Sequence, residues 1–518
     1  MSSRPLRPTS ATAVTLGEIA RGLGLAHEGD DVSVTGVALH TQAVMPGDVF
    51  VALQGVNRHG SEMVDEALAQ GAVAVFTDVA GCSALGATAT PAVVAENPRQ
   101  LLGALSALVY GTAQENHPPV FSVTGTNGKT STAFLLEALL RGIGRRTALS
   151  TTAERRVDGV AYPSSLTTPE APDIHAMLAL SREKGVGGVA IEVSAQALVK
   201  NRLQGVMSAV VGFTNLSHDH FEDFGGMEPY LQAKANLFQP AMARRGVICV
   251  DGEWGRALAQ QVTIPFTTVA GHTRGPSEWS YEVLPEPSET SRWHLRGPVG
   301  ESLELRAPII GEHMVANASL AVVMLKESGI PLEDISAAMG PGTTGIPVLI
   351  PGRVEKVSGT SGPSVFLDAG RSADAYEHTL AAIRALTTGK IVMVCGTSGN
   401  RDATKRPVMG AVAARGAEVV IVTDDDPRKE DPGLIRAGLL EGARSVRHRD
   451  VHDIPDPTTA IRFALTLVGE GDSVLWSGPG SQSYRDVGGE KVPYSAKREA
   501  QNALADAGWP EVAEERGP

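Results

Sequence analysis

The segment Phe121-Ser-Val-Thr-Gly-Thr-Asn-Gly-Lys-Thr-Ser-Thr132 decides the fold of the middle of the chain. A short apolar strand runs into a glycine turn, and Lys129-Thr130 opens a helix that continues through residues 133–140. Backbone N–H groups and the positive end of the helix dipole attract a phosphate chain at such a junction. The lysine can reach the outer phosphate, and the threonine hydroxyl can ligate Mg²⁺. We therefore expect a nucleotide phosphate loop, although its glycines are closer together than in the general Walker pattern.

The composition is that of an ordinary soluble enzyme. The chain has 518 residues, of which 42% are hydrophobic and 20% charged, and this length predicts about three domains. A net charge of −13 argues against nucleic acid as a partner, because nucleic-acid binding needs a basic face to neutralise phosphates. A small anionic substrate remains possible, since a few local arginines and lysines suffice to bind it.

Cysteine usage and hydropathy favour a cytoplasmic protein. Cys82, Cys249 and Cys395 lie in apolar runs without C-x-x-C spacing, so buried reduced thiols are expected rather than disulfides or zinc ligands. The N-terminal residues precede no apolar signal segment, and no run of 18 apolar residues occurs. We expect no membrane association, and a monomer is the simplest expectation for the oligomeric state.

The alternation of strands and helices predicts an α/β fold with three domains. Residues 1–113 are expected to form a small N-terminal α/β domain, of which residues 1–15 are a loose arm. Residues 114–345 are expected to form a central P-loop-type domain with a mostly parallel sheet. Residues 346–518 are expected to form a C-terminal Rossmann-like domain. Proline- and glycine-rich joints over 111–119 and 340–347 separate them. The expected strands of the two larger domains are 120–123, 188–193, 209–214, 246–250, 365–368, 390–395, 418–423 and 473–477.

Two strands after the phosphate loop end in polar clusters. Glu192 ends the first, where a carboxylate beside a phosphate loop suits Mg²⁺. Asp219-His220 follows the second and suits a metal site or an acid–base group. The adjacent Glu222-Asp223 are interpreted as a solvated acidic loop. Taken alone, Lys234 on the helix 230–238 would be a lysine that extends to the surface.

Taken together, these motifs have a recognisable order and spacing. They are Thr-Gly-Thr-Asn-Gly-Lys-Thr (124–130), Leu-Thr-Thr-Pro-Glu (166–170), Glu-Val-Ser (192–194), Thr-Asn-Leu-Ser-His-Asp-His (214–220), Ala-Lys-Ala-Asn-Leu-Phe (233–238), His-Met-Val-Ala-Asn-Ala (313–318), Pro-Gly-Arg-Val-Glu (351–355), Lys-Arg-Pro-Val-Met-Gly (405–410) and Asp-Asp-Pro-Arg-Lys-Glu-Asp-Pro (425–432). Over nearly its whole length the chain resembles the Mur ligase family, closest to its MurE branch, the ATP-dependent amide-forming enzymes of peptidoglycan precursor synthesis.

The resemblance implies a role for each matching residue. Lys129 would contact the γ-phosphate of ATP, Thr130 and Glu192 would hold one Mg²⁺, His220 would bind a second, and a carbamylated Lys234 would help to hold it. The residues implied in ATP binding are Gly125, Thr126, Asn127, Gly128, Lys129, Thr130 and Ser131 at the phosphates and Asn317, Arg353 and Asp368 at adenine and ribose. The implied reaction converts a carboxylate to an acyl phosphate, which the amine of an amino acid then attacks.

The positions expected to bind the UDP-sugar peptide are partly altered. Thr167, Thr168 and Arg202 match contacts to the sugar and its peptide. In the N-terminal domain Thr41 retains a hydroxyl, but the family arginine beside it is Gln42. The family Ser-Ser-His becomes Ser194-Ala-Gln196.

The positions expected to bind the incoming amino acid are altered more. Arg401 and Arg428 survive from the set that grips diaminopimelate in the family. Asp426 replaces an asparagine, and the segment from Gly478 ends in Gln482 where the family has glutamate. Losing that anion removes a charge-assisted contact to a distal ammonium, worth about 1.5–3 kcal/mol. Arg371 replaces a histidine near the domain junction, and the retained arginines suggest an acid-bearing amino acid or an anionic acceptor.

Three hypotheses remain open from the sequence. The first is a MurE-type ligase that adds meso-diaminopimelate, and the second is a paralogue with the same chemistry but another acceptor or amino acid. The substitutions favour the second slightly, because they gather at substrate positions while the ATP-binding motifs are intact. The third, a P-loop phosphotransferase or nucleotide-binding module, leaves Lys234, Asp219-His220 and the C-terminal domain unexplained.

Overall fold

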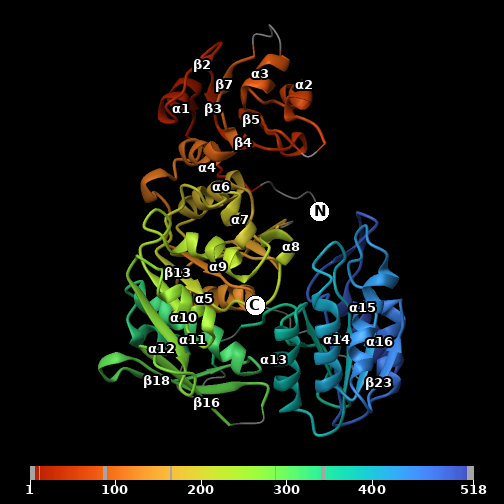
Figure 1. Ribbon diagram of the computed structural model, residues 1–518. Coiled ribbons are helices and arrows are strands. Elements are labelled where there is room, and N and C mark those ends of the chain that lie inside the picture. The colour runs from red at the N-terminus through yellow and green to blue at the C-terminus, as the bar shows by residue number, and fades with distance from the viewer. Residues whose placement is uncertain are drawn as a thin grey trace.

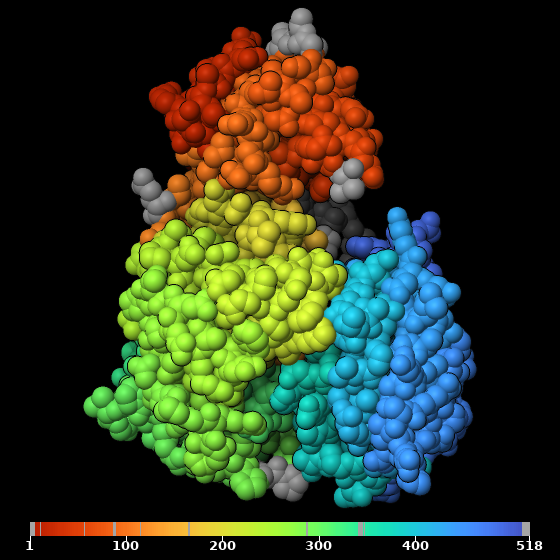
Figure 2. Space-filling model, in the orientation of Figure 1, coloured from red at the N-terminus to blue at the C-terminus, as the bar shows by residue number. Residues whose placement is uncertain are grey.

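The computed structural model describes residues 6–10, 12–55, 57–85, 90–163, 166–285, 288–339, 345–346 and 348–509. These residues form three bodies, each built around its own sheet (Figure 1). The N-terminal body, red to orange, lies on the central body, yellow to green, and the C-terminal body, teal to blue, lies beside the central one. The surfaces of the last two bodies meet along a seam (Figure 2).

The N-terminal domain is a small α/β unit. Its sheet has the strand order β2-β7-β6-β5-β4, parallel except for the edge strand β2. Its elements are β1 (Val14–Thr15), α1 (Leu16–Gly22), β2 (His27–Glu28), β3 (Ser33–Val34), β4 (Gly36–Ala38), η1 (Thr41–Ala43), β5 (Asp48–Ala52), η2 (Gly60–Met63), α2 (Val64–Ala69), β6 (Ala74–Thr77), α3 (Val79–Leu85), β7 (Ala92–Val94), α4 (Pro98–Val109) and η3 (Ala113–Glu115).

The central domain carries an eleven-stranded sheet in the order β11-β10-β9-β12-β8-β13-β14-β15-β16-β17-β18. Strands β9 to β16 in that order run parallel, and antiparallel strands extend both edges. The elements are β8 (Val120–Thr124), α5 (Lys129–Gly142), β9 (Thr147–Ser150), β10 (Arg155–Val157), β11 (Val160–Tyr162), α6 (Ala171–Glu183), β12 (Gly188–Glu192), α7 (Ala195–Val199), β13 (Val210–Phe213), α8 (Phe221–Phe224), α9 (Met227–Ala235), η4 (Asn236–Phe238), β14 (Gly246–Cys249), α10 (Glu253–Ala259), β15 (Phe266–Gly271), β16 (Trp279–Leu284), β17 (Ser291–Arg296), η5 (Pro298–Gly300), β18 (Ser302–Ala307), α11 (Glu312–Glu327) and α12 (Leu332–Met339).

The C-terminal domain is doubly wound, with the sheet order β19-β20-β24-β21-β22-β23 and only β19 antiparallel. Its elements are β19 (Glu355–Lys356), β20 (Ser364–Asp368), α13 (Ala373–Arg384), β21 (Ile391–Cys395), α14 (Lys405–Gly416), β22 (Val419–Val422), α15 (Pro432–Ser445), β23 (Asp450–Asp453), α16 (Pro457–Thr466), β24 (Ser473–Ser477), β25 (Tyr484–Val487), β26 (Glu490–Pro493) and α17 (Ala496–Asp506).

Apolar residues on both faces of each large sheet form the cores. In the central domain one core lies between the sheet and α5 and α11, and the other lies between the sheet and α6, α7 and α9. Strands β8, β12 and β13 are buried on both faces, which is why they read as continuous apolar runs. The carboxyl ends of β8, β12 and β13 therefore meet at one edge, where loops are free to bind ligands.

The α/β fold with a mostly parallel central sheet and a doubly wound C-terminal domain is confirmed. Two local expectations were wrong. Residues in the expected loose arm are tied down, because Arg7 Nη2 donates to Asp48 Oδ2 (2.8 Å) and β1 pairs with β3. The expected alternation of strands and helices does not continue to the end of the central domain, where β16, β17 and β18 form an antiparallel extension. Most of the joint over 340–347 lies outside the described residues.

Among the helices that the structure describes, none combines the length and the apolar character needed to cross a lipid bilayer.

Candidate active site

A cavity of about 800 Å³ lies between the central and C-terminal domains. Its central-domain wall comes from the loops after β8, β12 and β13 and from α11. Its opposite wall comes from the loops after β20 and β21, the start of α14 and the loop after β22. The cavity therefore stands at the carboxyl ends of the parallel strands of both sheets, where α/β proteins bind their ligands.

The phosphate loop is shaped by two glycines with positive φ. Gly125 has φ 148°, and a Cβ there would lie 1.9 Å from Thr214 Oγ1. Gly128 has φ 85°, and a Cβ there would lie 2.3 Å from Asn317 Oδ1. Only glycine fits these positions, since β13 and α11 approach the loop so closely. Helix α5 begins at Lys129 directly behind the turn, and its N-terminus faces the cavity as expected for a phosphate site.

Lys129, Thr130 and Glu192 meet at the start of α5. Lys129 Nζ donates to the carbonyl oxygens of Gly125 (3.1 Å) and Thr126 (2.8 Å) and lies 3.9 Å from Glu192 Oε1. Burial lowers the pKa of Lys129, and the nearby Glu192 carboxylate opposes that shift. Thr130 Oγ1 donates to Glu192 Oε2 (2.9 Å). A hydroxyl and a carboxylate side by side are the oxygen ligands that Mg²⁺ takes in nucleotide sites.

A second polar cluster surrounds His220, a non-glycine residue with φ 58°. Gln196 Nε2 lies 3.0 Å from His220 Nδ1 and donates to Asp223 Oδ2 (2.7 Å). Ligand atoms of His220, Glu222 and Asp223 all lie within 4.8 Å of one another. Burial lowers the pKa of His220, despite the opposing charge of Asp219, so a neutral imidazole is favoured. The sequence interpretation of Glu222-Asp223 as a solvated loop missed this convergence, although both residues are exposed.

Lys234 lies beneath the glycine turn rather than at the surface. The residue is 1% exposed, and its Nζ donates to the carbonyl oxygen of Gly125 (2.7 Å) and stands 4.3 Å from the centroid of the Tyr230 ring. Burial lowers the pKa of Lys234 well below its usual value, and the charge of Lys129 lowers it further. A buried lysine of this kind favours the free amine. Its position beside the phosphate loop agrees with the resemblance and not with the surface interpretation.

The three residues expected to bind adenine and ribose, Asn317, Arg353 and Asp368, all line the cavity. Arg353 Nη2 donates to Thr130 Oγ1 (3.1 Å), which joins the C-terminal domain to the phosphate loop. The Asp368 carboxylate accepts from the backbone N–H groups of Val354 (3.0 Å) and Gly370 (2.7 Å). Burial raises the pKa of Asp368, and the charge of Arg353 counteracts that shift.

Only some of the residues expected to bind the sugar peptide line the cavity. Thr167, Ser194 and Arg202 line the cavity. Thr168 is fully buried, where its Oγ1 donates to the carbonyl oxygen of Glu192 (2.9 Å) and accepts from the backbone N–H of Ser194 (3.0 Å). It therefore positions the loop after β12. Thr41 lies in η1 of the N-terminal domain and is not among the residues that line the cavity.

The residues expected to bind the amino acid lie on the C-terminal wall. Arg371, Arg401 and Arg428 line the cavity, whereas Asp426, Gly478 and Gln482 do not. Arg401 Nη1 lies 3.4 Å from Glu222 Oε1 of the central domain. Burial lowers the pKa of Arg428, and the charge of Arg401 adds to that shift. Both guanidiniums line the cavity, close enough for their charges to repel each other.

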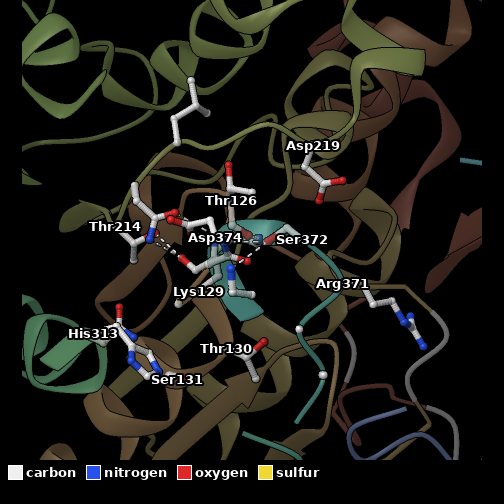
Figure 3. Close-up of a pocket in the computed structure, with 18 of the residues that line it drawn as sticks. Thr126, Lys129, Thr130, Ser131, Thr214, Asp219, His313, Arg371, Ser372 and Asp374 are labelled. Carbon is white, nitrogen blue, oxygen red and sulfur yellow. Dashed lines mark hydrogen bonds between the residues drawn. The ribbon is translucent and has the colours of Figure 1, made fainter. Parts of the chain in front are cut away.

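Several contacts across the cavity were not expected from the sequence. Asp374 Oδ2 accepts from Asn127 Nδ2 (2.8 Å), and Figure 3 shows Asp374 and Ser372 of the C-terminal domain beside the phosphate loop. Lys405 Nζ donates to Asp219 Oδ1 (2.8 Å), and its charge holds the pKa of Asp219 low although burial alone would raise it. Such partners are 186 or more positions apart, so no local pattern in the sequence points to them.

Comparison with known proteins places this arrangement in one family. The family models that match are described as "Mur ligase family, catalytic domain" over residues 33–110, "Mur ligase middle domain" over 123–325 and "Mur ligase, glutamate ligase domain" over 352–480.

Relatives match nearly the whole chain. A protein of Leifsonia xyli subsp. xyli named UDP-N-acetylmuramyl-tripeptide synthetase is 49% identical, covering 97% of this chain and 98% of that protein. A Streptomyces coelicolor protein named UDP-N-acetylmuramoyl-L-alanyl-D-glutamate–2,6-diaminopimelate ligase is 38% identical, with coverage of 96% and 98%. A solved structure described by the name of the same ligase has 25% identity and a TM-score of 0.64, covering 96% of this chain and all of that one.

Proposed function

Because this chain belongs to the Mur ligase family of ATP-dependent amide-forming ligases, we propose that it extends the peptide of UDP-N-acetylmuramoyl-L-alanyl-D-glutamate by one amino acid. This acceptor is the one in the name of the Streptomyces coelicolor relative. The name of the Leifsonia xyli relative specifies a tripeptide product but no amino acid. The proposed domain boundaries, near residues 113 and 345, fall between the matched family models.

The observation that carries the proposal is the shared cavity. A phosphate loop with Lys129, Thr130 and Glu192 on one wall faces Arg401 and Arg428 on the other. A phosphotransferase acting on a single bound substrate would not need the second wall. A ligase needs both, since it must bring ATP, a carboxylate and an amine together in one space.

We place one Mg²⁺ at Thr130 and Glu192 and a second at His220. The donor set fits, because Thr130 Oγ1 and Glu192 Oε2 lie 2.9 Å apart and the His220 imidazole is kept neutral by burial. When bound, the two ions would supply positive charge to the crowded phosphate and carboxylate oxygens. Lys129 adds a third positive charge from the helix N-terminus.

Lys234 is proposed to carry a carbamate. Its free amine, favoured by burial, is the nucleophile that takes up CO₂. Carbamylation adds CO₂ to this buried amine with loss of a proton, which gives an anion that can help to hold the second Mg²⁺. It would also place a negative charge close to the Lys129 ammonium, because both lysines donate to the carbonyl oxygen of Gly125 (2.7 and 3.1 Å).

The remaining residues are proposed to bind substrates. Asn317, Arg353 and Asp368 contact adenine and ribose, and the loop residues 125–131 cradle the phosphates. The acceptor is held by Thr41, Thr167, Ser194 and Arg202, with Thr41 reaching it from the N-terminal domain. Thr168, which is fully buried, positions the loop after β12 for this contact. The acceptor carboxylate takes the γ-phosphoryl group, the amine attacks the acyl phosphate, and phosphate leaves. The amine must be deprotonated first, and the carboxylates around His220 are near enough to the cavity to accept its proton.

A related ligase reaction on another acceptor is the second candidate. Gln196 favours it, because this residue stands where the family has a histidine and its amide is already engaged by His220 and Asp223. The protein is proposed to act in the cytoplasm as a monomer.

Phosphate release tests the proposal. The protein is incubated with ATP, Mg²⁺, UDP-N-acetylmuramoyl-L-alanyl-D-glutamate and a panel of amino acids, and the product mass is determined. We expect phosphate and a tripeptide product that require both acceptor and amino acid. Phosphate release with another carboxylate alone supports the second candidate, and ATP binding without acceptor-dependent turnover refutes the ligase proposal. Lys129→Met should abolish turnover, whereas Lys356→Met, which removes a lysine outside the cavity, should not.

A further inference from the structure

Arg371 stands between the cavity and a pair of buried aspartates. It follows β20, and its Nε lies 2.6 Å from Asp425 Oδ2. Its Nη2 donates to Asp426 Oδ2 (3.1 Å) and to Gln482 Oε1 (2.6 Å). The guanidinium thus gathers three partners from two other strand ends. Figure 3 shows Arg371 at the edge of the group of labelled cavity residues, apart from the phosphate loop.

The two aspartates are hidden behind that guanidinium. Asp425 is 6% exposed and Asp426 is 4% exposed, and neither lines the cavity, whereas Arg371 does. The second oxygen of Asp426 already accepts from the backbone N–H of Asp486 (3.1 Å). A molecule in the cavity therefore meets the cation and not the carboxylates.

The rest of this wall offers no free anion among the described residues. The carboxylates that line the cavity from the C-terminal domain are Asp368 and Asp374. Asp368 accepts from two backbone N–H groups of its own domain, and Asp374 accepts from Asn127 of the phosphate loop. Arg401 and Arg428 add two more guanidiniums to the wall. An ammonium group placed here would face like charges, and such a juxtaposition lowers affinity.

We propose that Arg371 sets the choice of amino acid, so that this ligase takes a donor whose side chain ends in an oxygen acceptor and rejects one that ends in an ammonium group. The inference rests on the proposed function and deepens it. Because Arg371 lines the cavity, a hydroxyl, amide or carboxylate oxygen bound there can accept from its guanidinium. The distal ammonium of a diamino acid could pair with Asp425 or Asp426, but both carboxylates already form ion pairs with Arg371.

Two amino acids of equal length test this directly. L-Homoserine and L-2,4-diaminobutyrate differ only in a terminal hydroxyl or ammonium, and L-glutamate supplies a carboxylate of similar reach. At pH 7 we expect kcat/KM with homoserine or glutamate to exceed that with diaminobutyrate by at least tenfold. A wild-type preference for diaminobutyrate, ornithine, lysine or diaminopimelate would overturn the proposal.

Variants of Arg371 separate specificity from stability. Arg371→Met uncovers the aspartates and should shift the ratio toward diaminobutyrate by at least tenfold, whereas Arg371→Lys keeps the charge and should keep the preference. Arg436→Met is the matched control, because Arg436 also pairs with two aspartates, Asp424 and Asp453, but lies outside the cavity. It should leave the ratio unchanged. An unchanged ratio in a folded Arg371→Met enzyme would refute the role of Arg371.

Direct binding distinguishes this inference from the proposed function. Calorimetric titration of the Mg²⁺·ATP-loaded protein with homoserine and with diaminobutyrate reports the preference without an acceptor. Failure of every acceptor assay would refute the proposed function, while the binding ratio would still decide the inference. Tighter binding of diaminobutyrate to the wild-type protein would contradict it even if turnover is observed, and so would unaltered discrimination in a folded Arg371→Met protein.

Discussion

Replacing Lys234 by methionine should separate activity from stability. The substitution keeps an unbranched side chain of similar volume in a site that is 1% exposed. It removes an amine that has no carboxylate within ion-pair distance among the described residues. The carbonyl oxygen of Gly125 keeps a partner, since Lys129 Nζ also donates to it (3.1 Å). No buried acceptor is left unsatisfied by the change.

The two effects have opposite expected signs. Removing one preorganised electrostatic group from a phosphate site lowers kcat by about 10²–10³, or about 2.7–4 kcal/mol of transition-state stabilisation. Removing a buried amine without a counter-ion relieves its desolvation cost, so stability should stay equal or rise. For a domain of this size about 1 kcal/mol corresponds to about 2–4 °C in Tm, so we expect Tm to fall by no more than about 3 °C.

The assay is phosphate release at saturating substrates together with thermal unfolding of the same preparations. Lys356→Met serves as the control lysine. Two results would refute the reasoning: activity within tenfold of wild type, or a loss of activity accompanied by a fall in Tm of more than about 10 °C. In the companion variant Lys234→Ala, added short carboxylates should restore part of the activity. A ¹³C carbamate signal after equilibration with labelled bicarbonate should be present in wild type and absent in the variant.

Three further predictions address other parts of the molecule. Glu192→Gln keeps the shape but not the charge beside Thr130, so the Mg²⁺ concentration for half-maximal phosphate release should rise at least tenfold; an unchanged Mg²⁺ dependence would contradict the metal assignment. Arg428→Lys should raise KM for the amino acid at least tenfold with little change in KM for ATP, because a guanidinium binds a carboxylate through two hydrogen bonds and an ammonium does not. Equal rises in both KM values would contradict a role of Arg428 in binding the amino acid. Burial lowers the pKa of His175 from 6.5 to about 4. Between these pH values the unfolded chain binds a proton that the folded chain does not. The free energy of unfolding, measured with urea, should therefore fall by up to about 3 kcal/mol as the pH is lowered through that window. In His175→Asn this part of the pH dependence should disappear.

Local chemistry made the phosphate loop and the buried strands predictable. The glycine spacing before Lys129 and the continuous apolar runs of the parallel strands are properties of short segments, and the structure has them at the expected places. The antiparallel extension was missed although a signal was present. In β17 the buried Trp293 and Leu295 alternate with more exposed residues, which is the period of a half-buried strand.

Positions that depend on distant partners were not predictable from the residues alone. From its own helix alone, Lys234 was interpreted as a surface lysine, because no neighbouring residue indicates that the glycine turn covers it. Only the family resemblance predicted a place for Lys234 at the phosphate site. Arg371 was expected near the domain junction, but its three partners come from two other strand ends and meet it only in the folded domain. The roles of these residues in catalysis and binding remain predictions that the proposed variants test.

The hydrogen bonds between the central and C-terminal walls of the cavity have a consequence for the rate of turnover. Arg353 and Asp374 of the C-terminal domain hold Thr130 and Asn127, which are themselves part of the phosphate loop (3.1 and 2.8 Å). We expect a triphosphate that binds to this loop to replace these two contacts, and the product nucleotide to leave only after the two domains separate. We therefore expect the separation of the two walls to limit the rate of turnover.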